Sequence, residues 1–393
     1  MKKKIVSLLL TGVMAVGALA GCGGQSIADQ QAASDTSADS SEGGDSADSS
    51  TATMAAADEV DGTEITFWHS MGGVNGQAID ELVNRFNEEN ELGITVVSEY
   101  QGEYDDALNK LRSAQIGNMG ADLVQVYEIG TRFMIDSGWI IPMQEMIDQD
   151  NYDVSQIEPN LAAYYTIDDQ LYSMPFNSST PLMYYNVDMF EKAGITEIPT
   201  SLEGIEAIGD QLLNEGGASE VISLGIYGWF FEQFLGKQGL DYANNGNGRE
   251  AAATAVAFDE NGGAANILNA WKSLSDKGYA PIVGRGGDAG LADFSSGASA
   301  ITLGSTASLK QILQDVNGRF EVGTAYFPSI TDEDQGGVSI GGASLWALNN
   351  NDPKKLRATW EFVKFLISPE SQAYWNAQTG YFPVTVAAQE EQV

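Results

Sequence analysis

Short apolar runs alternate along most of this chain with longer segments of helical periodicity. The first apolar runs lie at 65–68, 94–97 and 121–126, and the segments between them at 74–90 and 104–116. The apolar runs are of the length and type found in buried strands, whereas the longer segments place apolar side chains three or four positions apart. This alternation predicts a parallel sheet covered by helices, which is the α/β class.

The same pattern continues through the second half of the chain. Further strands are predicted at 182–187, 300–303, 320–327 and 343–348, and further helices at 188–193, 201–214, 264–277, 307–316, 353–367 and 369–380. No internal repeat is visible. Roughly 330 residues of α/β sequence are too many for one small sheet, so we expect two lobes.

The balance of charge excludes one large class of partners. The chain has 55 Asp and Glu against 19 Lys and Arg, a net charge of −36. Because no basic surface can be assembled from so few scattered cations, nucleic acid is excluded as a partner. The chain from residue 65 onward is itself acidic, so an anionic ligand would depend on local dipoles and a few cations.

Residue types needed for several kinds of chemistry are scarce. One Cys and one His rule out a disulfide framework and a thiolate or His-rich metal site, and they argue against a serine-type triad. Gly236-Lys237 is followed by Gln238, so no phosphate-binding loop of the Walker type is present. Residues 284–290 lack the third glycine of a dinucleotide loop, and 332–343 lack the final Glu of a calcium loop. We therefore expect no cofactor and no metal, while a hydrolase that uses paired carboxylates remains an alternative.

The N-terminus has the pattern of a bacterial lipoprotein signal peptide. Basic residues at 2–4 precede an apolar stretch at 5–20, which ends in Leu19-Ala20-Gly21-Cys22. Small residues before a cysteine are typical of a site where the cysteine is lipidated and becomes the first residue of the mature chain. We predict a signal peptide at 1–21, lipidation of Cys22, and a location on the extracellular face of the bacterial cell membrane.

The segment after Cys22 has the composition of a tether. Residues 23–64 contain ten Asp and Glu, no Lys or Arg, and few large apolar side chains. Such a sequence buries too little apolar surface to offset the entropy lost on ordering. We predict a disordered acidic tether at 22–62.

Five blocks in the body are similar to a known family. They are Phe67-Trp68-His69-Ser70-Met71 with Arg85-Phe86-Asn87, Gln125-Val126-Tyr127-Glu128-Ile129-Gly130-Thr131, Pro175-Phe176-Asn177-Ser178-Ser179-Thr180-Pro181 with Tyr184-Tyr185-Asn186, Gly341-Gly342-Ala343-Ser344-Leu345-Trp346, and Thr379-Gly380-Tyr381-Phe382-Pro383-Val384-Thr385. These blocks resemble the extracellular solute-binding proteins of ATP-binding-cassette importers, and within that family its glycerol-phosphate-binding members.

This resemblance implies the two-lobe periplasmic-binding-protein fold of type II, with strands that cross between the lobes as a hinge. We expect crossings near 176–182, 303–305 and 341–343. The boundaries that follow are lobe I at 63–176 and 304–341, and lobe II at 177–303 and 342–393. It also implies a monomeric binding protein without enzymatic activity, which delivers a polyol phosphate or sugar to permease subunits in the membrane.

The resemblance further implies a ligand-binding site. By position, the family's ligand-binding residues match Tyr104, Glu128, Ser179, Trp229, Ser305, Gly342 and Tyr381. Glu128 would accept hydrogen bonds from hydroxyl groups, and the face of Trp229 would cover a carbon skeleton. Backbone N–H groups at Gly342 and at the helix start after Ser305 would favour an anion. His69 follows a predicted strand, and we expect it to lie near ligand or to hold a structural hydrogen bond.

Two departures from the glycerol-phosphate binders affect the choice of ligand. Their C-terminal tail supplies an arginine that meets phosphate, whereas this sequence ends in Gln389-Glu390-Glu391-Gln392-Val393. A tryptophan of the family is replaced here by Ile226. The expected ligand is therefore sn-glycerol-3-phosphate or a glycerophosphodiester, with a neutral sugar or oligosaccharide as the alternative. Arg132 and Arg285 are candidates for the missing phosphate contact, and an adhesive or sensory lipoprotein of the same fold is a further alternative.

Overall fold

The computed structural model describes residues 52–117 and 120–390. The predicted signal peptide, Cys22 and most of the predicted tether lie outside these residues. Across the described ranges, no helix is long and apolar enough to cross a bilayer.

The first sheet contains strands from both ends of the described chain. Its order is β2-β1-β3-β13-β4, and β7 also pairs with β13. The strands are β1 (Glu64–His69), β2 (Thr95–Tyr100), β3 (Leu123–Tyr127), β4 (Ile140–Ile141), β7 (Met174–Ser179) and β13 (Gly341–Leu348). Strands β1, β2 and β3 are parallel, whereas β13 runs antiparallel to β3, β4 and β7. The expected parallel sheet is thus a mixed one.

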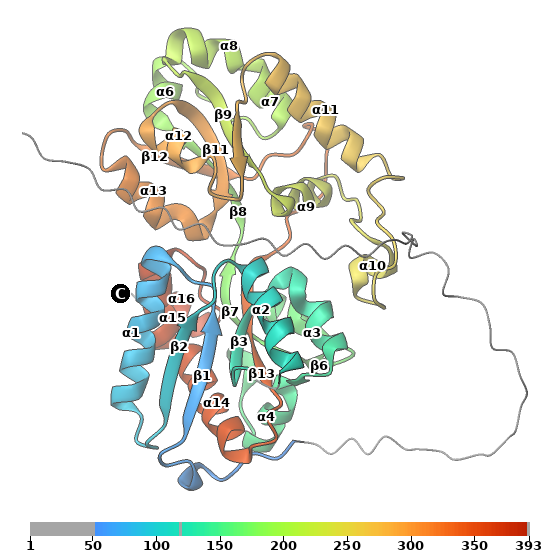
Figure 1. Cartoon of the computed structure of the whole chain (residues 1–393). Helices are drawn as coiled ribbons and strands as arrows, with labels where there is room; N and C mark the ends of the chain where they lie inside the picture. Colours follow the sequence, from blue (N-terminus) through green and yellow to red (C-terminus); the bar gives the residue numbers. More distant parts are fainter. Residues whose placement is uncertain (1–51, 118–119, 391–393) are drawn as a thin grey trace, which may run out of the picture. The chain divides into compact units, whose positions relative to one another are not determined.

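Helices cover both faces of this sheet, as Figure 1 shows. They are α1 (Gly73–Glu89), α2 (Tyr104–Ile116), α3 (Thr131–Ser137), α4 (Met143–Asp150), α5 (Pro159–Tyr165), α14 (Pro353–Leu366), α15 (Pro369–Thr379) and α16 (Val386–Glu390). Neighbouring residues of β3 face opposite sides, since Leu123 belongs to the core under α1 and α14 while Val124 belongs to the core under α2 and α3. Burial on both faces explains why β3 carries apolar side chains at successive positions, with Gln125 as the polar exception. A two-stranded ribbon, β5 (Thr166–Ile167) and β6 (Gln170–Leu171), follows α5.

The second sheet has the order β10-β9-β11-β8-β12. Its strands are β8 (Pro181–Asn186), β9 (Glu220–Ile226), β10 (Ile282–Arg285), β11 (Ser299–Ser305) and β12 (Val322–Tyr326). The helices around it are α6 (Val187–Lys192), α7 (Leu202–Ala207), α8 (Gly209–Gln211), α9 (Gly228–Lys237), α10 (Asn244–Gly248), α11 (Gly263–Asp276), α12 (Leu291–Ser296) and α13 (Leu309–Val316). The two sheets and their cores make the two lobes of a type II periplasmic-binding-protein fold, as the family resemblance implied.

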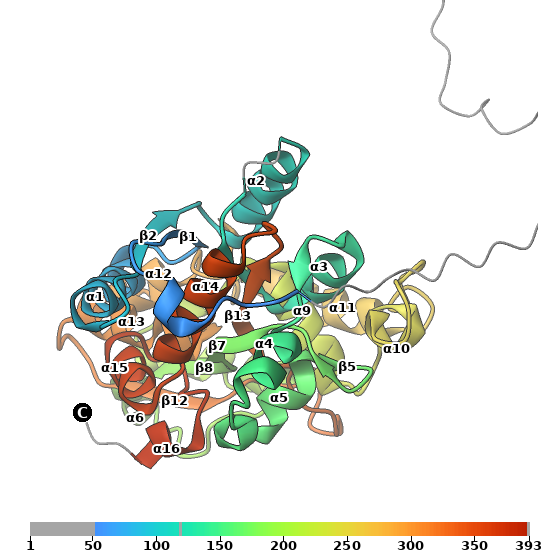
Figure 2. The same ribbon diagram turned by 90° about the horizontal axis from the view of Figure 1, so that it is seen from below.

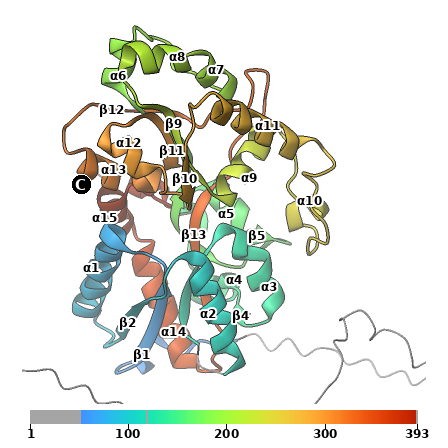
Figure 3. The same ribbon diagram turned by 45° about the horizontal axis from the view of Figure 1, so that its top comes forward.

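The chain passes between the two sheets at two places. Strand β7 of the first sheet ends at Ser179 and β8 of the second begins at Pro181, so Thr180 joins them. The return runs through 327–340, between β12 and Gly341. The first place lies within the expected crossing at 176–182, and the second immediately precedes the one expected at 341–343. Figure 1 shows β7 leading toward β8, and Figure 3 shows β13 reaching toward the second sheet. The third expected crossing is absent from the described chain, because β11 lies wholly in the second sheet.

The sheets therefore divide the chain differently from the predicted lobe boundaries. Residues 304–340 go with the second lobe, and 342–390 with the first, where the sequence placed them the other way round. The reason is that β13 pairs with β3 and buries Leu345 and Trp346 on the two faces of the first sheet. Figure 2, viewed from below, shows α14 lying close to β1 and β13.

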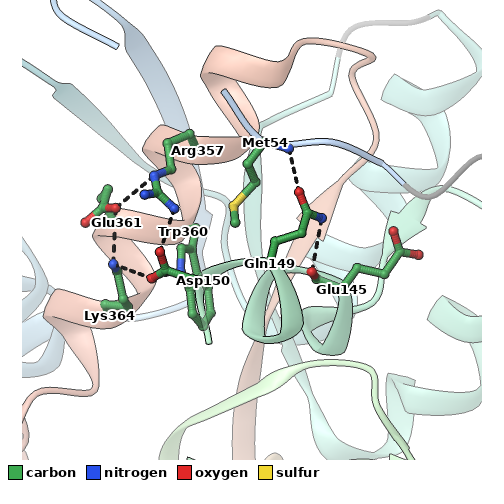
Figure 4. A network of polar contacts seen from close by, with 8 residues as sticks. All are labelled: Met54, Glu145, Gln149, Asp150, Arg357, Trp360, Glu361 and Lys364. Carbon is green, nitrogen blue, oxygen red and sulfur yellow. Dashed lines mark hydrogen bonds and ion pairs between the residues drawn. The ribbon is translucent and has the colours of Figure 1, made fainter. Parts of the chain in front are cut away.

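The described residues just before β1 pack against the first lobe. The Ala52 N–H donates to Glu145 Oε2 at 2.9 Å, and the Met54 N–H donates to Gln149 Oε1 at 2.9 Å. Gln149 Nε2 donates in return to the Ala52 carbonyl at 2.7 Å. Figure 4 shows the contact between Met54 and Gln149. Val60 is fully buried in the core. We call residues 52–60 the strap; it lies within the segment that the sequence assigned to the tether.

Candidate ligand-binding site

The place where the chain crosses between the lobes, here called the junction, brings together Trp229, Ser179 and Gly341. Ser179 and Gly341 are paired neighbours on β7 and β13. A Cβ atom added to Gly341 would lie 2.5 Å from Cζ2 of Trp229 and 2.9 Å from Oγ of Ser179. Trp229 belongs to the first turn of α9 in the second lobe, so its indole lies over the crossing strands of the first. The indole Nε1 is buried and has no hydrogen-bond partner among the described residues, which leaves a donor for a ligand oxygen.

Asn177 links the tyrosines of the predicted site. Its Nδ2 donates to the Tyr104 hydroxyl at 3.0 Å, and the side chains of Tyr104 and Asn177 both lie close to the Tyr381 hydroxyl. Gly342 has φ +99°, and a Cβ atom there would stand 1.8 Å from the Asn177 carbonyl oxygen. No residue with a side chain fits at this position without moving the strand. Asn177 lies in one of the blocks that resemble the family, but no sequence pattern indicated its role.

Aromatic rings support these hydroxyl groups. The Tyr104 ring stacks on Tyr127 with centroids 5.2 Å apart, and the Tyr381 ring stacks on Trp375 at 5.6 Å. Burial raises the pKa of both Tyr104 and Tyr381, so both hydroxyl groups stay protonated and can donate.

Ser305 lies on the second-lobe side of the junction, but the hydrogen-bonding groups around it already have partners within the protein. Its Oγ accepts from the Ala307 N–H at 3.2 Å, and its carbonyl accepts from the Tyr184 hydroxyl at 2.7 Å. The Thr306 N–H donates to the Thr180 carbonyl at 3.0 Å. The N–H groups of Thr306 and Ala307, expected to face an anion, are therefore bonded within the protein.

Carboxylates from both lobes lie close to this junction. Glu128 is buried at the end of β3, and its pKa is raised to about 8, mainly by burial and further by the charge of Glu232. Glu232 is half-buried on α9 of the second lobe, and burial raises its pKa to about 7. At neutral pH much of this pair is protonated, so Glu128 can donate a hydrogen bond as well as accept one.

A second pair of acids faces across the lobes nearer to solvent. Loss of solvation raises the pKa of Glu103, just before α2, and the charge of Asp288 raises it further. Asp288 follows β10 and accepts from Ser308 Oγ at 3.4 Å. Because every ionised member of these two pairs repels an anion, the region is unfavourable for a compact dianion.

Among the described residues, neither arginine proposed for phosphate bonds to a residue of the junction. Arg132 forms an ion pair with Asp136 of its own helix at 2.6 Å. Arg285 is exposed at the end of β10, where it pairs with Ile226. Tyr227, the next residue after Ile226, lies with its ring 6.4 Å from that of Trp229. No residue pattern marked Tyr227, Glu232 or Asp288 in the sequence, because only the fold brings them to the junction.

His69 lies in the core of the first lobe. It is buried, and its Nδ1 accepts from the Met71 N–H at 3.3 Å. Burial lowers its pKa to about 4, so the ring is neutral at physiological pH. In the ranges that the structure describes, no three His, Cys, Asp or Glu side chains gather in the manner of a metal site.

Comparison with known proteins identifies the family. Residues 81–393 match the model of the bacterial extracellular solute-binding proteins. The chain belongs to this family. Proteins of this family bind small-molecule solutes outside the cell membrane and deliver them to the permease of an ATP-binding-cassette importer, and the coarse prediction is thereby confirmed.

Relatives within the solute-binding family include glycerol-phosphate binders. The chain is 36% identical over 336 residues to the sn-glycerol-3-phosphate-binding periplasmic protein UgpB of Salmonella typhimurium, covering 84% of this chain and 76% of that protein. It is 33% identical to UgpB of Yersinia pestis, with 84% and 75% covered. These relatives are binding proteins, not enzymes.

Solved structures give the same picture of the fold. UgpB from Mycobacterium tuberculosis in complex with glycerophosphocholine has a TM-score of 0.72 at 26% identity, with 83% of each chain covered. The acarbose-binding GacH receptor of Streptomyces glaucescens has a TM-score of 0.69 at 20% identity, with 84% of this chain and 83% of that chain covered. The second likeness concerns the fold alone.

Proposed function

We propose that this protein captures a glycerophosphodiester with a cationic headgroup, such as glycerophosphocholine, and delivers it to an importer without chemical change. The ligand would lie at the junction formed by Tyr104, Asn177, Tyr381, Ser179 and Trp229. Glu128, Ser305 and Gly342 would complete its surroundings. Closure of the lobes about the crossing strands would enclose it.

The acidic side chains of the junction are the observation that carries this choice of ligand, because each one that is ionised repels an anion. Four acidic side chains from two lobes approach it: Glu103, Glu128, Glu232 and Asp288. A phosphate monoester carries nearly two negative charges at neutral pH, whereas a diester carries one. A choline group balances that one charge and can lie against aromatic rings. The glycerophosphocholine complex of a relative supports the same class.

A neutral oligosaccharide is the second candidate. Carboxylates accept hydrogen bonds from sugar hydroxyls, and the face of Trp229 suits a sugar ring. In either case we propose that the mature protein is a monomer held on the outer face of the membrane through lipid on Cys22.

Isothermal titration calorimetry with glycerophosphocholine, sn-glycerol-3-phosphate and maltose at pH 7 tests the ligand class. We expect glycerophosphocholine to bind at least tenfold more tightly than sn-glycerol-3-phosphate, roughly 1.4 kcal/mol. Tighter binding of the monoester would contradict the charge argument, and tighter binding of maltose would favour the second candidate. ³¹P NMR of the recovered ligand distinguishes capture from hydrolysis, because a hydrolase would return a phosphate monoester.

A further inference from the structure

An arginine of the second lobe holds the end of a helix in the first. Arg249 lies in the excursion between α9 and α11, which Figures 1 and 3 show extending from the second lobe beside the first. Its Nη1 donates to the Tyr164 carbonyl at 3.0 Å, and its Nη2 donates to the carbonyls of Ala163 and Thr166 at 3.3 and 3.1 Å. These carbonyls are at the C-terminus of α5, where the helix dipole favours a cation.

The segment that carries Arg249 is internally braced. Asn245, Gly246 and Asn247 have φ between +56° and +58°, the left-handed region, which glycine and asparagine tolerate best. Asn247 Oδ1 accepts from the N–H groups of Tyr242 and Ala243 at 2.8 and 2.9 Å. We call residues 241–257 the arm.

Further asparagine side chains tie the two halves of the arm together. Asn244 Oδ1 accepts from the Thr254 N–H at 3.0 Å, and Asn245 Nδ2 donates to the Ala252 carbonyl at 2.8 Å. At the base of the arm, the rings of Tyr242 and Phe258 pack with centroids 4.9 Å apart. Arg249 is therefore presented from a preformed structure, which lowers the entropy lost when its contact forms.

The same helix end supports a residue of the candidate site. The Tyr164 ring lies 5.5 Å from the Arg249 guanidinium carbon. The Tyr164 hydroxyl donates to the Glu128 carbonyl at 3.3 Å. A continuous chain of contacts thus runs from the arm through Tyr164 to the backbone of Glu128.

We propose that Arg249 is a positioning residue that couples the approach of the two lobes to the order of the ligand-binding site. When the lobes are together, the arm clasps the end of α5 and holds Tyr164 under Glu128. When the lobes part, the hydrogen bonds from Arg249 to these carbonyls break; we call this set of bonds the clasp. Its acceptors are uncharged carbonyls, so the contact can be broken at lower cost than a buried ion pair. The link to ligand affinity rests on the proposed function, whereas the link to lobe separation does not.

Spin labels across the lobes test the clasp without ligand. Cys22 is changed to Ser in the full chain, and exposed Glu88 of α1 and Glu203 of α7 are changed to Cys for labelling. Double electron–electron resonance then measures the distance between them. We expect Arg249→Ala to shift the ligand-free distribution to longer distances. An unchanged distribution would overturn the proposal, whatever ligand the protein binds.

A matched arginine separates the clasp from ordinary stability. Arg319 is also exposed in the second lobe and donates to the carbonyls of Asp315 and Val316, but these belong to α13 of its own lobe. Arg319→Ala should leave the lobe distance unchanged. If both variants lengthen the distance equally, the effect of Arg249 is a general loss of stability and the proposal is wrong.

Ligand dissociation measures the coupling to the site. With glycerophosphocholine as the probe, we expect Arg249→Ala to raise the dissociation rate about tenfold, the scale of one charge-assisted contact. Arg249→Lys should restore part of the loss, since an ammonium group cannot span three carbonyls. Tyr164→Phe should weaken binding and, combined with Arg249→Ala, give less than the summed effect. Additive effects would refute coupling through Tyr164. Absence of binding by the wild type would instead count against the proposed function.

Discussion

The Trp229 indole rests against the backbone of Gly341, with room for no atom between Cζ2 and the Gly341 Cα hydrogens. Helix α9 of the second lobe thus begins on top of the strand that leads back into the first. Because the indole belongs to the second lobe and Gly341 to the first, this contact spans the two lobes.

Substitution of Gly341 by Ala should disturb that contact selectively. The new Cβ would stand 2.5 Å from Trp229 and 2.9 Å from Ser179, so the indole must shift. We expect affinity for the preferred ligand to fall about tenfold, as measured by calorimetry. Gly337→Ala is the control, because nothing lies within 4 Å of its Cβ position. Equal affinities in both variants would show that the indole does not contact ligand.

Substitutions of Trp229 should separate its apolar face from its polar edge. Trp229→Ala removes both and should weaken binding tenfold or more. Trp229→Phe retains an apolar ring but not the unpartnered Nε1 donor. Its affinity should therefore lie between those of the wild type and Trp229→Ala. Thermal unfolding of each variant checks that the fold is intact. Wild-type affinity in Trp229→Ala would remove this residue from the site.

Glu128 should make the protein less stable as the pH rises. Burial, with the charge of Glu232, raises its pKa from 4.5 to about 8 in the folded protein. Below pH 4.5 both states hold the proton, but between pH 4.5 and 8 only the folded state does. The stability that the raised pKa provides is therefore lost progressively over this window, on the order of a few kcal/mol.

Urea denaturation of the wild type and of Glu128→Gln at several pH values measures this loss. The stability of the wild type relative to the variant should fall from pH 5 to pH 8, since the glutamine does not ionise. Glu88→Gln, at an exposed position of α1, should follow the wild type. Parallel curves for wild type and Glu128→Gln would contradict the assignment.

Asp150 should act in the opposite direction. Burial by itself raises its pKa, but hydrogen bonds from Lys364, Trp360 and Arg357 outweigh it and lower the pKa to about 2 (Figure 4). Its stabilising effect is present above pH 3.8 and is lost as the pH falls through about 2. We expect Asp150→Asn to cost about 2 kcal/mol at pH 7 and much less near pH 2. An equal cost at both pH values would refute the ionic contribution.

Removing two methyl groups from the strap should measure how firmly it is packed. Val60 is fully buried, so Val60→Ala leaves a cavity and should cost about 2 kcal/mol in urea denaturation. Val338, which is 40% exposed, offers the same substitution without a cavity. Similar costs at both positions would mean that the strap adds little to the stability of the first lobe.

Local periodicity predicted many elements well. The helix expected at 104–116 is α2, and the one expected at 74–90 is α1, Gly73–Glu89. The strand expected at 320–327 is the shorter β12, Val322–Tyr326. These segments are defined by apolar side chains a few positions apart, and such patterns are visible within a single window of sequence.

The sequence pattern could not predict which distant segments pair with one another. An apolar run such as 343–348 indicates a strand but not the sheet that it joins, which is why the lobe boundaries differ. The same holds for the junction. Glu128 and Glu232 come together because α9 follows a strand of the second sheet, while Glu128 directly follows a strand of the first. Nothing in the sequence next to Asn177 or Tyr227 indicates which distant residues they contact.

The strap determines how a pull on the chain would reach the folded body. Residues 52–55 bond to α4 and to Pro353, which follows the end of β13. The other end of β13 is Gly341, eight residues of extended strand away. Tension applied at residue 52 would therefore enter the first lobe at the end of the sheet remote from the crossing strands. The first lobe would then be held at that end, and the second lobe would remain free to move about the crossing strands.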